Sequence, residues 1–422
     1  MNNRMKYDVV IIGGGTAGVS CAWNAGRLGL KTLLIEKDIH LGGSITSALV
    51  IPAMKVDSKD INVDFYNELI KTAQLYNAQI TYSDGNKGWF NPELLKVVFD
   101  EMLENSGVDV LLGVKITDLS IKGSSYEFNI INNMLSIYAE TNNLVDATGN
   151  GNIFEILNCE FLNDNTKKQA QGYRFIMSGV NLEEFADWIL DLDKDREVTT
   201  SCVVDGLVHL STAYTWDKSR KWALKPVFDK ALKNNDLKDI DSAYFQVFTI
   251  AGMPDSIAFN CPRLFIDEEK GVFATSKAIS EGRKQIFRLS QFCKNYLKGF
   301  EYAYISNIAS QIGVRDSRRI KGKYVYTEDD IINKTTFKNT ALACDYPIDI
   351  HSEKKDDGGL SFTKGVYYLP IESLISEKYD NLFAIGKCFS ASFKAQAALR
   401  TQVSCFSMGE AVAKWIKTGK AN

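Results

Sequence analysis

The glycine-rich turn at residues 13–18 constrains the fold of this chain more than any other feature. Residues 7–12, which precede it, are almost all apolar and rich in β-branched side chains, as expected of a strand buried on both faces. Residues 16–28 predict a helix, and residues 31–36 predict a second buried strand. A strand, a helix and a strand in this order predict parallel strands joined by a right-handed crossover, which defines an α/β fold.

The glycines of this turn follow the spacing Gly13-x-Gly15-x-x-Gly18, and Glu36 stands at the end of the second predicted strand. The first glycine allows a tight turn, the second lets the backbone approach a pyrophosphate, and the third lets helix and strand pack closely. The helix N-terminus at Thr16 and Ala17 offers free N–H groups to phosphates. Because an acid at position 36 accepts hydrogen bonds from ribose hydroxyls, the motif predicts a Rossmann-like dinucleotide-binding domain. Spacing alone does not separate FAD from NAD.

The length of 422 residues predicts two intimate domains. We expect the first part of the nucleotide-binding domain at residues 1–160, a mixed α+β cap domain for the substrate at 161–345, and the C-terminal part of the nucleotide-binding domain at 346–422. The other predicted elements are a helix at 93–105, strands at 108–112, 116–121, 126–131, 134–139, 143–147, 173–178, 243–250, 257–264 and 382–385, and helices at 185–192 and 395–416.

Composition excludes several classes of protein. The net charge of −3, with mixed signs along the chain, gives no electrostatic footprint for nucleic acid or for an anionic membrane. The sequence has no run of about 18 apolar residues, so no membrane span is predicted. No signal peptide is expected. The eight cysteines are scattered and form no CxxC pair, so we expect neither disulfides nor a metal site but reduced thiols in the cytoplasm.

Three further segments resemble one group of nucleotide-binding proteins. Residues 35–37 with Leu41-Gly42-Gly43-Ser44, the "ATG" segment at 147–152 and the strand and turn at 381–387 are similar to flavoproteins of the glutathione-reductase-like superfamily. Segments at 257–260, 281–283, 313–320, 346–351 and 368–371 resemble one branch, the FAD-dependent oxidoreductases often labelled by fumarate-reductase or xanthan-lyase analogy. The resemblance runs nearly from end to end of the chain.

This resemblance implies a non-covalent FAD and a second domain that roofs the isoalloxazine ring. The cofactor residues expected from motif and resemblance together are Gly13, Gly15, Thr16, Ala17, Gly18, Glu36, Lys37, Gly42, Gly43, Ser44, Val114, Ala147, Thr148, Gly149, Gly386, Ala398 and Leu399. Two departures stand out. Asn150 and Asn152 replace the acids usual in the ATG segment, and residues 392–396 lack the His or Glu usual after the last FAD strand.

The candidate catalytic residues are Arg315, His351 and Arg400. Arg315 follows a Gly-Val turn and is expected to clamp a substrate carboxylate, the alternative being a salt bridge with a nearby aspartate. Arg400 lies in the terminal helical region, where it either contacts flavin or substrate or stays solvated. His351 is one of three histidines, and the resemblance favours it as an acid or base over a purely structural role.

Aromatic and sulfur side chains offer further alternatives. Tyr173 with Phe175, and Tyr244 with Phe248, each share one face of a predicted strand and either line a substrate cavity or pack in the core. Cys388 and Cys405 stand near the last FAD segment, and without a partner thiol close in sequence we expect buried apolar cysteines.

The leading hypothesis is an enzyme that transfers a hydride between a small organic substrate and the flavin N5, with an unknown electron donor or acceptor. A first alternative is an enzyme of the same fold that consumes NAD, as thiazole-forming enzymes do. A second is a flavin-bearing RNA-modifying protein, which the absence of a basic stripe disfavours. A disulfide reductase is disfavoured because the sequence has no CxxC and no second GxGxxG in mid-chain.

Overall fold

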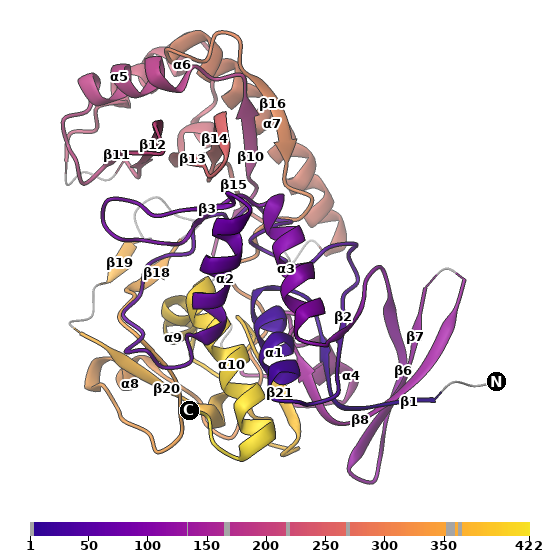
Figure 1. The fold of residues 1–422 in the computed structure, drawn as a ribbon. Helices are drawn as coiled ribbons and strands as arrows, with labels where there is room; N and C mark the ends of the chain where they lie inside the picture. Colours follow the sequence, from indigo (N-terminus) through magenta and orange to yellow (C-terminus); the bar gives the residue numbers. More distant parts are fainter. Residues whose placement is uncertain are drawn as a thin grey trace.

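The computed structural model describes residues 4–132, 134–163, 169–216, 220–266, 271–351, 359–361 and 365–422. In Figure 1 the chain forms two sheet-based layers, one above the other, and the first and last parts of the sequence share the lower one. A mixed α/β architecture with a parallel sheet was predicted, and the structure confirms it. The domain limits near 160 and 345 stay a prediction.

The lower sheet has seven strands and is built around the predicted strand–helix–strand unit. Its parallel part has the order β5-β2-β1-β8, and β21 pairs in parallel with the last residues of β8, at 144–146. Antiparallel β7 and β6 extend the sheet from β8. These elements are β1 (Arg4–Ile12), α1 (Thr16–Arg27), β2 (Thr32–Ile35), β5 (Asp109–Leu111), β6 (Lys115–Lys122), β7 (Ser125–Ile131), β8 (Ser136–Asp146) and β21 (Leu382–Ala384).

One predicted pair of strands is wrong in detail. The segments 134–139 and 143–147 were expected as separate strands, but they form the single strand β8. Thr141 pairs with both Tyr7 of β1 and Tyr126 of β7, and Asn143 pairs with Val9. Because neighbours on both sides hold the polar stretch in the ladder, the chain does not turn there.

Helices cover this sheet and bring the C-terminus back to the N-terminal motif. They are α2 (Asp64–Leu75), α3 (Leu94–Asn105), α4 (Asn152–Ile156), α9 (Phe393–Leu399) and α10 (Gln402–Thr418). Helix α10 lies directly against α1, and Gly409 permits this contact because a Cβ there would stand 2.4 Å from the Ala17 carbonyl oxygen. The last stretch of sequence therefore lies in the same layer as the N-terminal glycine motif (Figure 1).

The predicted helix at 395–416 is interrupted. Helix α9 ends at Leu399, and α10 begins only at Gln402, because Thr401 adopts an extended conformation with φ −63° and ψ 155°. The Thr401 hydroxyl lies 2.9 Å from that of Ser404, three residues along the chain. It makes no hydrogen bond to the backbone of the first turn of α10.

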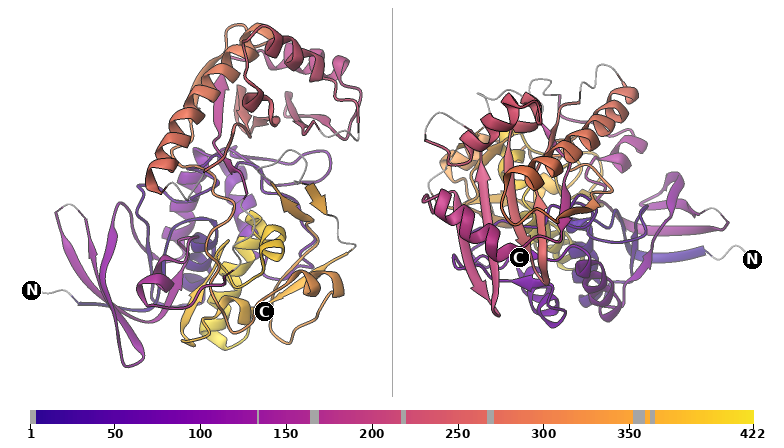
Figure 2. Two further views of the ribbon diagram at one scale, coloured as in Figure 1. Left: turned by 180° about the vertical axis from the view of Figure 1, so that it is seen from behind. Right: turned by 90° about the horizontal axis from the view of Figure 1, so that it is seen from above.

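The upper sheet is antiparallel and has the order β11-β12-β13-β14-β10-β16. Figures 1 and 2 show its helices on the side away from the lower layer, so that its other face is turned toward that layer. Its elements are β10 (Phe175–Ser178), α5 (Leu182–Leu192), β11 (Thr199–Val204), β12 (Leu207–Tyr214), α6 (Lys225–Lys233), the 3-10 turn η1 (Asp239–Ser242), β13 (Phe245–Ile250), β14 (Met253–Phe259), α7 (Val272–Tyr296) and β16 (Tyr304–Ile308).

The remaining elements are short and lie outside the two main sheets. The predicted strand 257–264 is split, since β14 ends before Pro262, which lacks an N–H group for the ladder. The residues after Pro262 form β15, which pairs with β9. These elements are β3 (Gln79–Ile80) with β4 (Trp89–Phe90), β9 (Gln171–Gly172) with β15 (Arg263–Leu264), β17 (Thr340–Cys344) with β20 (Tyr367–Pro370), β18 (Ile348–Ile350) with β19 (Gly359–Ser361), α8 (Glu328–Asn333) and the 3-10 turn η3 (Ile371–Leu374).

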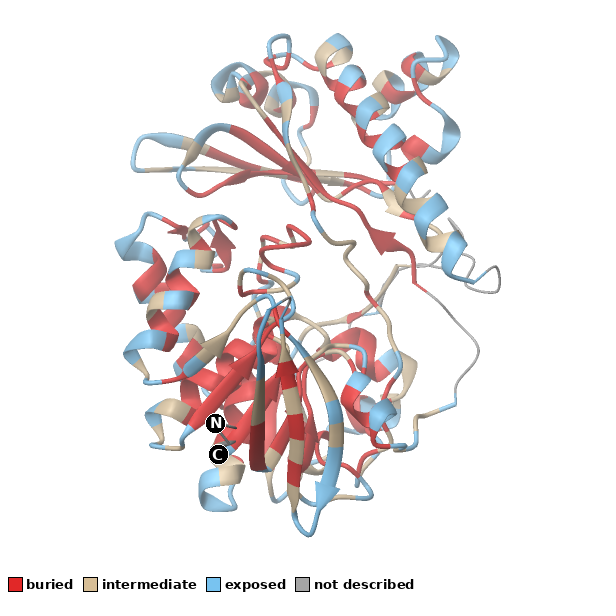
Figure 3. Ribbon diagram, turned by 90° about the vertical axis from the view of Figure 1, so that its right-hand side faces the viewer, coloured by how far each residue is buried: buried red, intermediate tan, exposed pale blue. Residues whose placement is uncertain are grey.

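The two faces of the upper sheet differ in what they pack against. Along β13, Phe245 contacts the rings of Phe228 and Phe292 under the helices, whereas Gln246 and Phe248 line a cavity on the opposite face. Figure 3 shows buried residues along strands of both layers. Within the described ranges, no helix is both long enough and apolar enough to cross a membrane.

Candidate cofactor and substrate site

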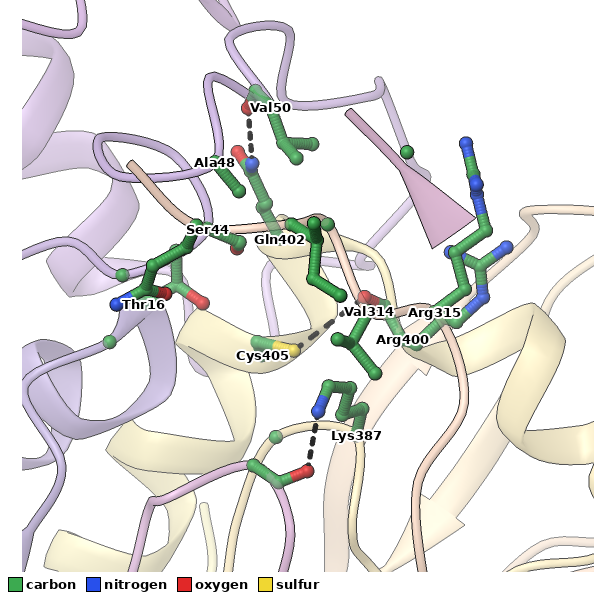
Figure 4. A pocket seen from close by; sticks show the side chains of 18 of the residues that line it. Thr16, Ser44, Ala48, Val50, Val314, Arg315, Lys387, Arg400, Gln402 and Cys405 are labelled. Carbon is green, nitrogen blue, oxygen red and sulfur yellow. Dashed lines mark hydrogen bonds between the residues drawn. The ribbon is translucent and has the colours of Figure 1, made fainter. Parts of the chain in front are cut away.

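A cavity of about 1260 Å³ lies between the two layers and is lined by residues of both. Pockets for a single small ligand typically occupy about 300–1,000 Å³, so this cavity has room for a dinucleotide together with a small substrate. In Figure 4, Thr16 and Ser44 lie on one side, and Arg315 and Arg400 lie on the other. Gln402, Cys405, Val314 and Lys387 stand between these two sides. We name them the glycine end and the arginine end.

The glycine end has the shape that a pyrophosphate requires. Gly13 has a φ of +111°, and a Cβ there would meet the Ala147 carbonyl oxygen at 2.4 Å. Gly15, in contrast, would have nothing within 4 Å of an added Cβ, because its open side faces the cavity. Gly15 is also the N-cap of α1, with no side chain bonded to the first turn. The free N–H groups of that turn form an anion site.

Glu36 is buried and fixed at the end of β2. One of its carboxylate oxygens accepts a hydrogen bond from the Gly14 N–H at 2.6 Å, and the other accepts one from the Asp38 N–H at 2.9 Å. Its side chain lines the cavity together with Lys37. This placement fits the role predicted for it, which is to accept ribose hydroxyls.

The predicted cofactor residues are mostly brought together. Those that line the cavity are Gly13, Gly15, Thr16, Ala17, Glu36, Lys37, Gly43, Ser44, Val114, Ala147, Thr148, Gly149 and Gly386. Four others, Gly18, Gly42, Ala398 and Leu399, are not among the residues that line it. Ala397 and Gln402, which were not predicted, line the cavity on the C-terminal side.

The four residues off the cavity have packing roles instead. A Cβ at Gly18 would stand 1.9 Å from the Gly13 carbonyl oxygen, and one at Gly42 would stand 2.6 Å from the Thr46 methyl carbon. Ala398 and Leu399 are fully buried. Their contact with the cofactor stays a prediction, and in this structure the four residues support the loops and helices that form the cavity walls.

The ATG turn is anchored by a carboxylate that sequence reasoning did not single out. Asp146 accepts hydrogen bonds from the N–H and hydroxyl of Thr148 at 3.0 and 2.6 Å and from the N–H of Ile153 at 2.8 Å. Lys387 donates to the Gly149 carbonyl oxygen at 2.6 Å (Figure 4). The turn is thus held from below by β8 and from the side by the segment after β21.

Both predicted arginines line the arginine end, and two unpredicted ones join them. Arg315 and Arg400 are accompanied by Arg174, which precedes β10, and Arg263, which belongs to β15. Arg174 donates to the Leu49 carbonyl oxygen at 3.1 Å, and Arg263 stacks over the Tyr244 ring at 4.0 Å. Burial lowers the pKa of Arg174 to about 10, and burial with the neighbouring arginine charges lowers the pKa of Arg315.

His351 also lies at the arginine end, but its ring is fully engaged. Arg263 Nη2 lies 2.9 Å from Nδ1, and Asp349 Oδ2 lies 3.1 Å from Nε2. Because a guanidinium only donates, Nδ1 is the acceptor and Nε2–H donates to the carboxylate. Burial lowers the pKa of His351 to about 3, so the ring is neutral near pH 7. The acid–base role of His351 stays a prediction, and in this structure both ring nitrogens contact other side chains, Arg263 and Asp349.

The remaining alternatives from the sequence divide between wall and core. Tyr244 and Phe248 line the cavity, whereas Phe175 stacks on Phe259 with a centroid distance of 4.2 Å in the core. Cys388 and Cys405 are buried, as expected, and burial raises the pKa of each thiol to about 12. A thiolate role is therefore disfavoured, although Cys405 lines the cavity.

Sequence reasoning missed Arg174, Arg263 and Asp349. Arg174 could have been predicted from the sequence, because it is the single charged residue in an otherwise mostly apolar predicted strand. A cation in that position is expected to be buried and to need a partner. Asp349 lies in the segment 346–351, which was considered only for its resemblance to the family. Arg263 had no local signal of its own.

Fold and site together define a dinucleotide-binding protein with a substrate chamber. The family model described as "FAD dependent oxidoreductase" matches residues 8–418. The chain therefore belongs to the FAD-dependent oxidoreductase family, an enzyme family whose cofactor is FAD. This confirms the predicted cofactor, disfavours the NAD-consuming alternative, and agrees with the glycine end, where Gly15 leaves space beside a free helix N-terminus.

Curated relatives match only part of the chain. A digeranylgeranylglycerophospholipid reductase of Methanococcus vannielii is 29% identical over 149 residues, which are 34% of this chain and 37% of that protein. A reductase of the same name from Sulfolobus acidocaldarius is 28% identical over 160 residues, covering 35% and 34% of the two chains. The matches thus span little more than a third of these relatives.

Solved structures resemble the chain over nearly its whole length at low identity. A p-nitrophenol 4-monooxygenase from Pseudomonas putida has a TM-score of 0.50 at 10% identity, covering 99% of this chain and 81% of that one. A geranylgeranyl bacteriochlorophyll reductase-like protein from Thermoplasma acidophilum has a TM-score of 0.46 at 12% identity, covering 98% and 79%. Identities this low concern the fold alone.

Proposed function

We propose that this enzyme transfers a hydride between FAD and a small organic substrate held at the arginine end of the cavity. The observation that carries the proposal is the shared cavity, because one continuous space joins the glycine end to side chains of the upper sheet. When bound, FAD supplies the hydride acceptor or donor at N5. The chain supplies binding, orientation and exclusion of water.

In this proposal the glycine end holds the dinucleotide. The N–H groups at the start of α1 bind its pyrophosphate, and Glu36 binds a ribose. The turn at Gly386, Ala397 of α9 and Gln402 at the start of α10 form the wall toward the reacting end. Gln402 is held in place by donating to the Val50 carbonyl oxygen (Figure 4).

The upper sheet closes the chamber over the substrate. Gln246 and Phe248 of β13 and Asn260 beyond β14 line the wall opposite the lower layer. An apolar ring beside fixed amides orients a substrate and displaces water from the reacting atoms. All eight cysteines are free, and these thiols support the cytoplasm as the location in this proposal.

The test is the visible spectrum of the purified protein, followed by anaerobic titration with candidate substrates. We expect flavin bands near about 370 and 450 nm, and loss of the band near about 450 nm with an oxidisable substrate. Reduced enzyme is tested in parallel for reoxidation by electron-accepting substrates, so that both directions of electron flow are covered. If purified protein carries no flavin and does not take up added FAD, the proposal is refuted.

A further inference from the structure

Four arginines converge on one end of the cavity, and one carboxylate faces them. Arg174, Arg263, Arg315 and Arg400, which we call the arginine cluster, line the same space as Asp349. His351 beside them is neutral near pH 7. The cluster therefore carries an excess of positive charge inside the protein, and no single neighbour in the described part of this end neutralises it.

The arginines are close enough to repel one another. Burial lowers the pKa of Arg315, and the charges of Arg400, Arg263 and Arg174 lower it further. Arg174 and Arg315 are 8% and 7% exposed. Guanidinium groups nevertheless keep their proton near neutral pH. The Asp349 carboxylate lies 3.6 Å from Arg400 Nη2 and compensates one of the four charges. Because unpaired buried cations are costly, a bound anion would stabilise the rest of the cluster.

Polar atoms at this end are left without partners. Arg263 Nε and Arg400 Nε are buried and have no hydrogen-bond acceptor among the described residues. Gln402 Oε1, which lies between the two ends, is buried and has no donor among them. The Nη2 group of each arginine has partners in the protein. Arg263 donates to His351, and Arg400 donates to the Gln169 side chain at 3.3 Å and to the Asp349 carbonyl oxygen at 3.1 Å.

The cluster is preorganised by both layers. Arg315 is fixed at its backbone, because its N–H donates to Gln171 Oε1 at 2.8 Å and its carbonyl oxygen accepts from Gln396 Nε2 at 3.1 Å. Arg263 is held by the Tyr244 ring and His351. The arginines come from four separate places, which are the residue before β10, the short strand β15, the segment that contains Arg315 and the α9–α10 break, so only the assembled fold forms the cluster.

Building on the proposed function, we propose that the substrate is a small anion with at least two negative charges, bound through the arginine cluster. Carboxylate and phosphate groups share the acceptor geometry that guanidinium groups recognise. A neutral substrate would leave the excess charge uncompensated. A dianion compensates that charge and accepts hydrogen bonds from the guanidinium groups that line the cavity.

Calorimetric titration of the purified holoenzyme tests this, with succinate, inorganic phosphate and succinamide as probes. Succinamide is the neutral match for succinate, and the comparison of succinate with phosphate decides which anion is preferred. The variants are Arg400→Gln and Arg263→Gln, with Arg400→Lys as the conservative variant. Arg220→Gln is the matched control, since Arg220 pairs with Asp195 on the surface and does not line the cavity.

We expect one of the two anions to bind and the neutral amide not to bind. Each glutamine variant should weaken the affinity for that anion by about tenfold or more. Arg220→Gln should leave binding unchanged, and Arg400→Lys should restore part of it. Equal binding of succinate and succinamide, no binding of either anion, or unchanged anion affinity in both glutamine variants would overturn the proposal. Flavin content and melting temperature are measured on every variant, so a folding defect is visible.

These readouts separate the two proposals. Protein without flavin refutes the hydride-transfer function, while calorimetry on that same protein still decides whether the arginine cluster binds anions. Protein with flavin that binds no anion refutes the substrate class alone.

Discussion

Substitution of two glycines of the N-terminal motif should have different effects, one on FAD binding and the other on the stability of the apoprotein. Gly15 has a φ of −73°, which any residue adopts, and an added Cβ meets nothing within 4 Å. We therefore expect Gly15→Glu to fold, with apoprotein stability within about 1 kcal/mol of wild type, the scale of a changed N-cap. Its side chain fills the pyrophosphate space and adds a repelling charge, so FAD should be lost.

Gly18→Ala should behave differently because its Cβ would stand 1.9 Å from the Gly13 carbonyl oxygen. Relieving that overlap moves α1 or the turn, and overpacking of this kind costs about 1–3 kcal/mol. The apoprotein itself should be destabilised. Ser124→Glu, an exposed added charge in the β6–β7 turn, is the control for Gly15→Glu.

The assay is denaturant unfolding of each apoprotein with and without FAD, together with the released flavin per chain. Free FAD at about 100 times its Kd should stabilise the wild type by about 2.7 kcal/mol. Gly15→Glu should show none of this gain, and Ser124→Glu should show all of it. Retention of stoichiometric FAD by Gly15→Glu, or wild-type apoprotein stability for Gly18→Ala, would refute this account of the site.

Three further outcomes are expected. Arg288→Gln should destabilise the protein by about 3–5 kcal/mol in urea unfolding, because Arg288 forms two hydrogen bonds with the fully buried Asp241 carboxylate; an unchanged midpoint would contradict this. The pKa of His351 is about 3 in the folded chain and about 6.5 unfolded, so unfolded chains bind more protons between these values. Stability should fall as the pH drops through that range, by at most about 1.4 kcal/mol per unit, and His351→Gln should flatten the slope. Thiol labelling of native protein at pH 8 should spare Cys388 and Cys405, whose pKa values burial raises to about 12; fast labelling of either would show an opening that the structure lacks.

Local patterns predicted the nucleotide-binding layer because its signals are short and contiguous. A buried strand, a glycine turn and a small-residue helix fit within about 30 residues, and the structure confirms them as β1, α1 and β2. Errors arose where neighbours decide the outcome. The strand β8 continues through Thr141 only because β1 and β7 both pair with it, and no property of that segment alone reports those partners.

The arginine cluster was only half predicted for the same reason. Arg315 and Arg400 were found from their places in the chain, whereas Arg263 is brought in by pairing of β15 with β9, with Arg263 opposite Gly172. The acid–base prediction for His351 assumed an ordinary pKa. The burial and the arginine charge that lower it come from segments that the sequence does not place beside it.

The two ends of the cavity depend on different features of the chain. The glycine end depends on backbone shape, since Gly13 and Gly15 act through the absence of side chains and changes there disturb FAD itself. The arginine end depends on side chains supplied by separate segments around the break at Thr401. Such side chains can change without altering the backbone that holds FAD, so the cofactor follows from the family, whereas the substrate has to be inferred from the charges that this particular chain gathers opposite it.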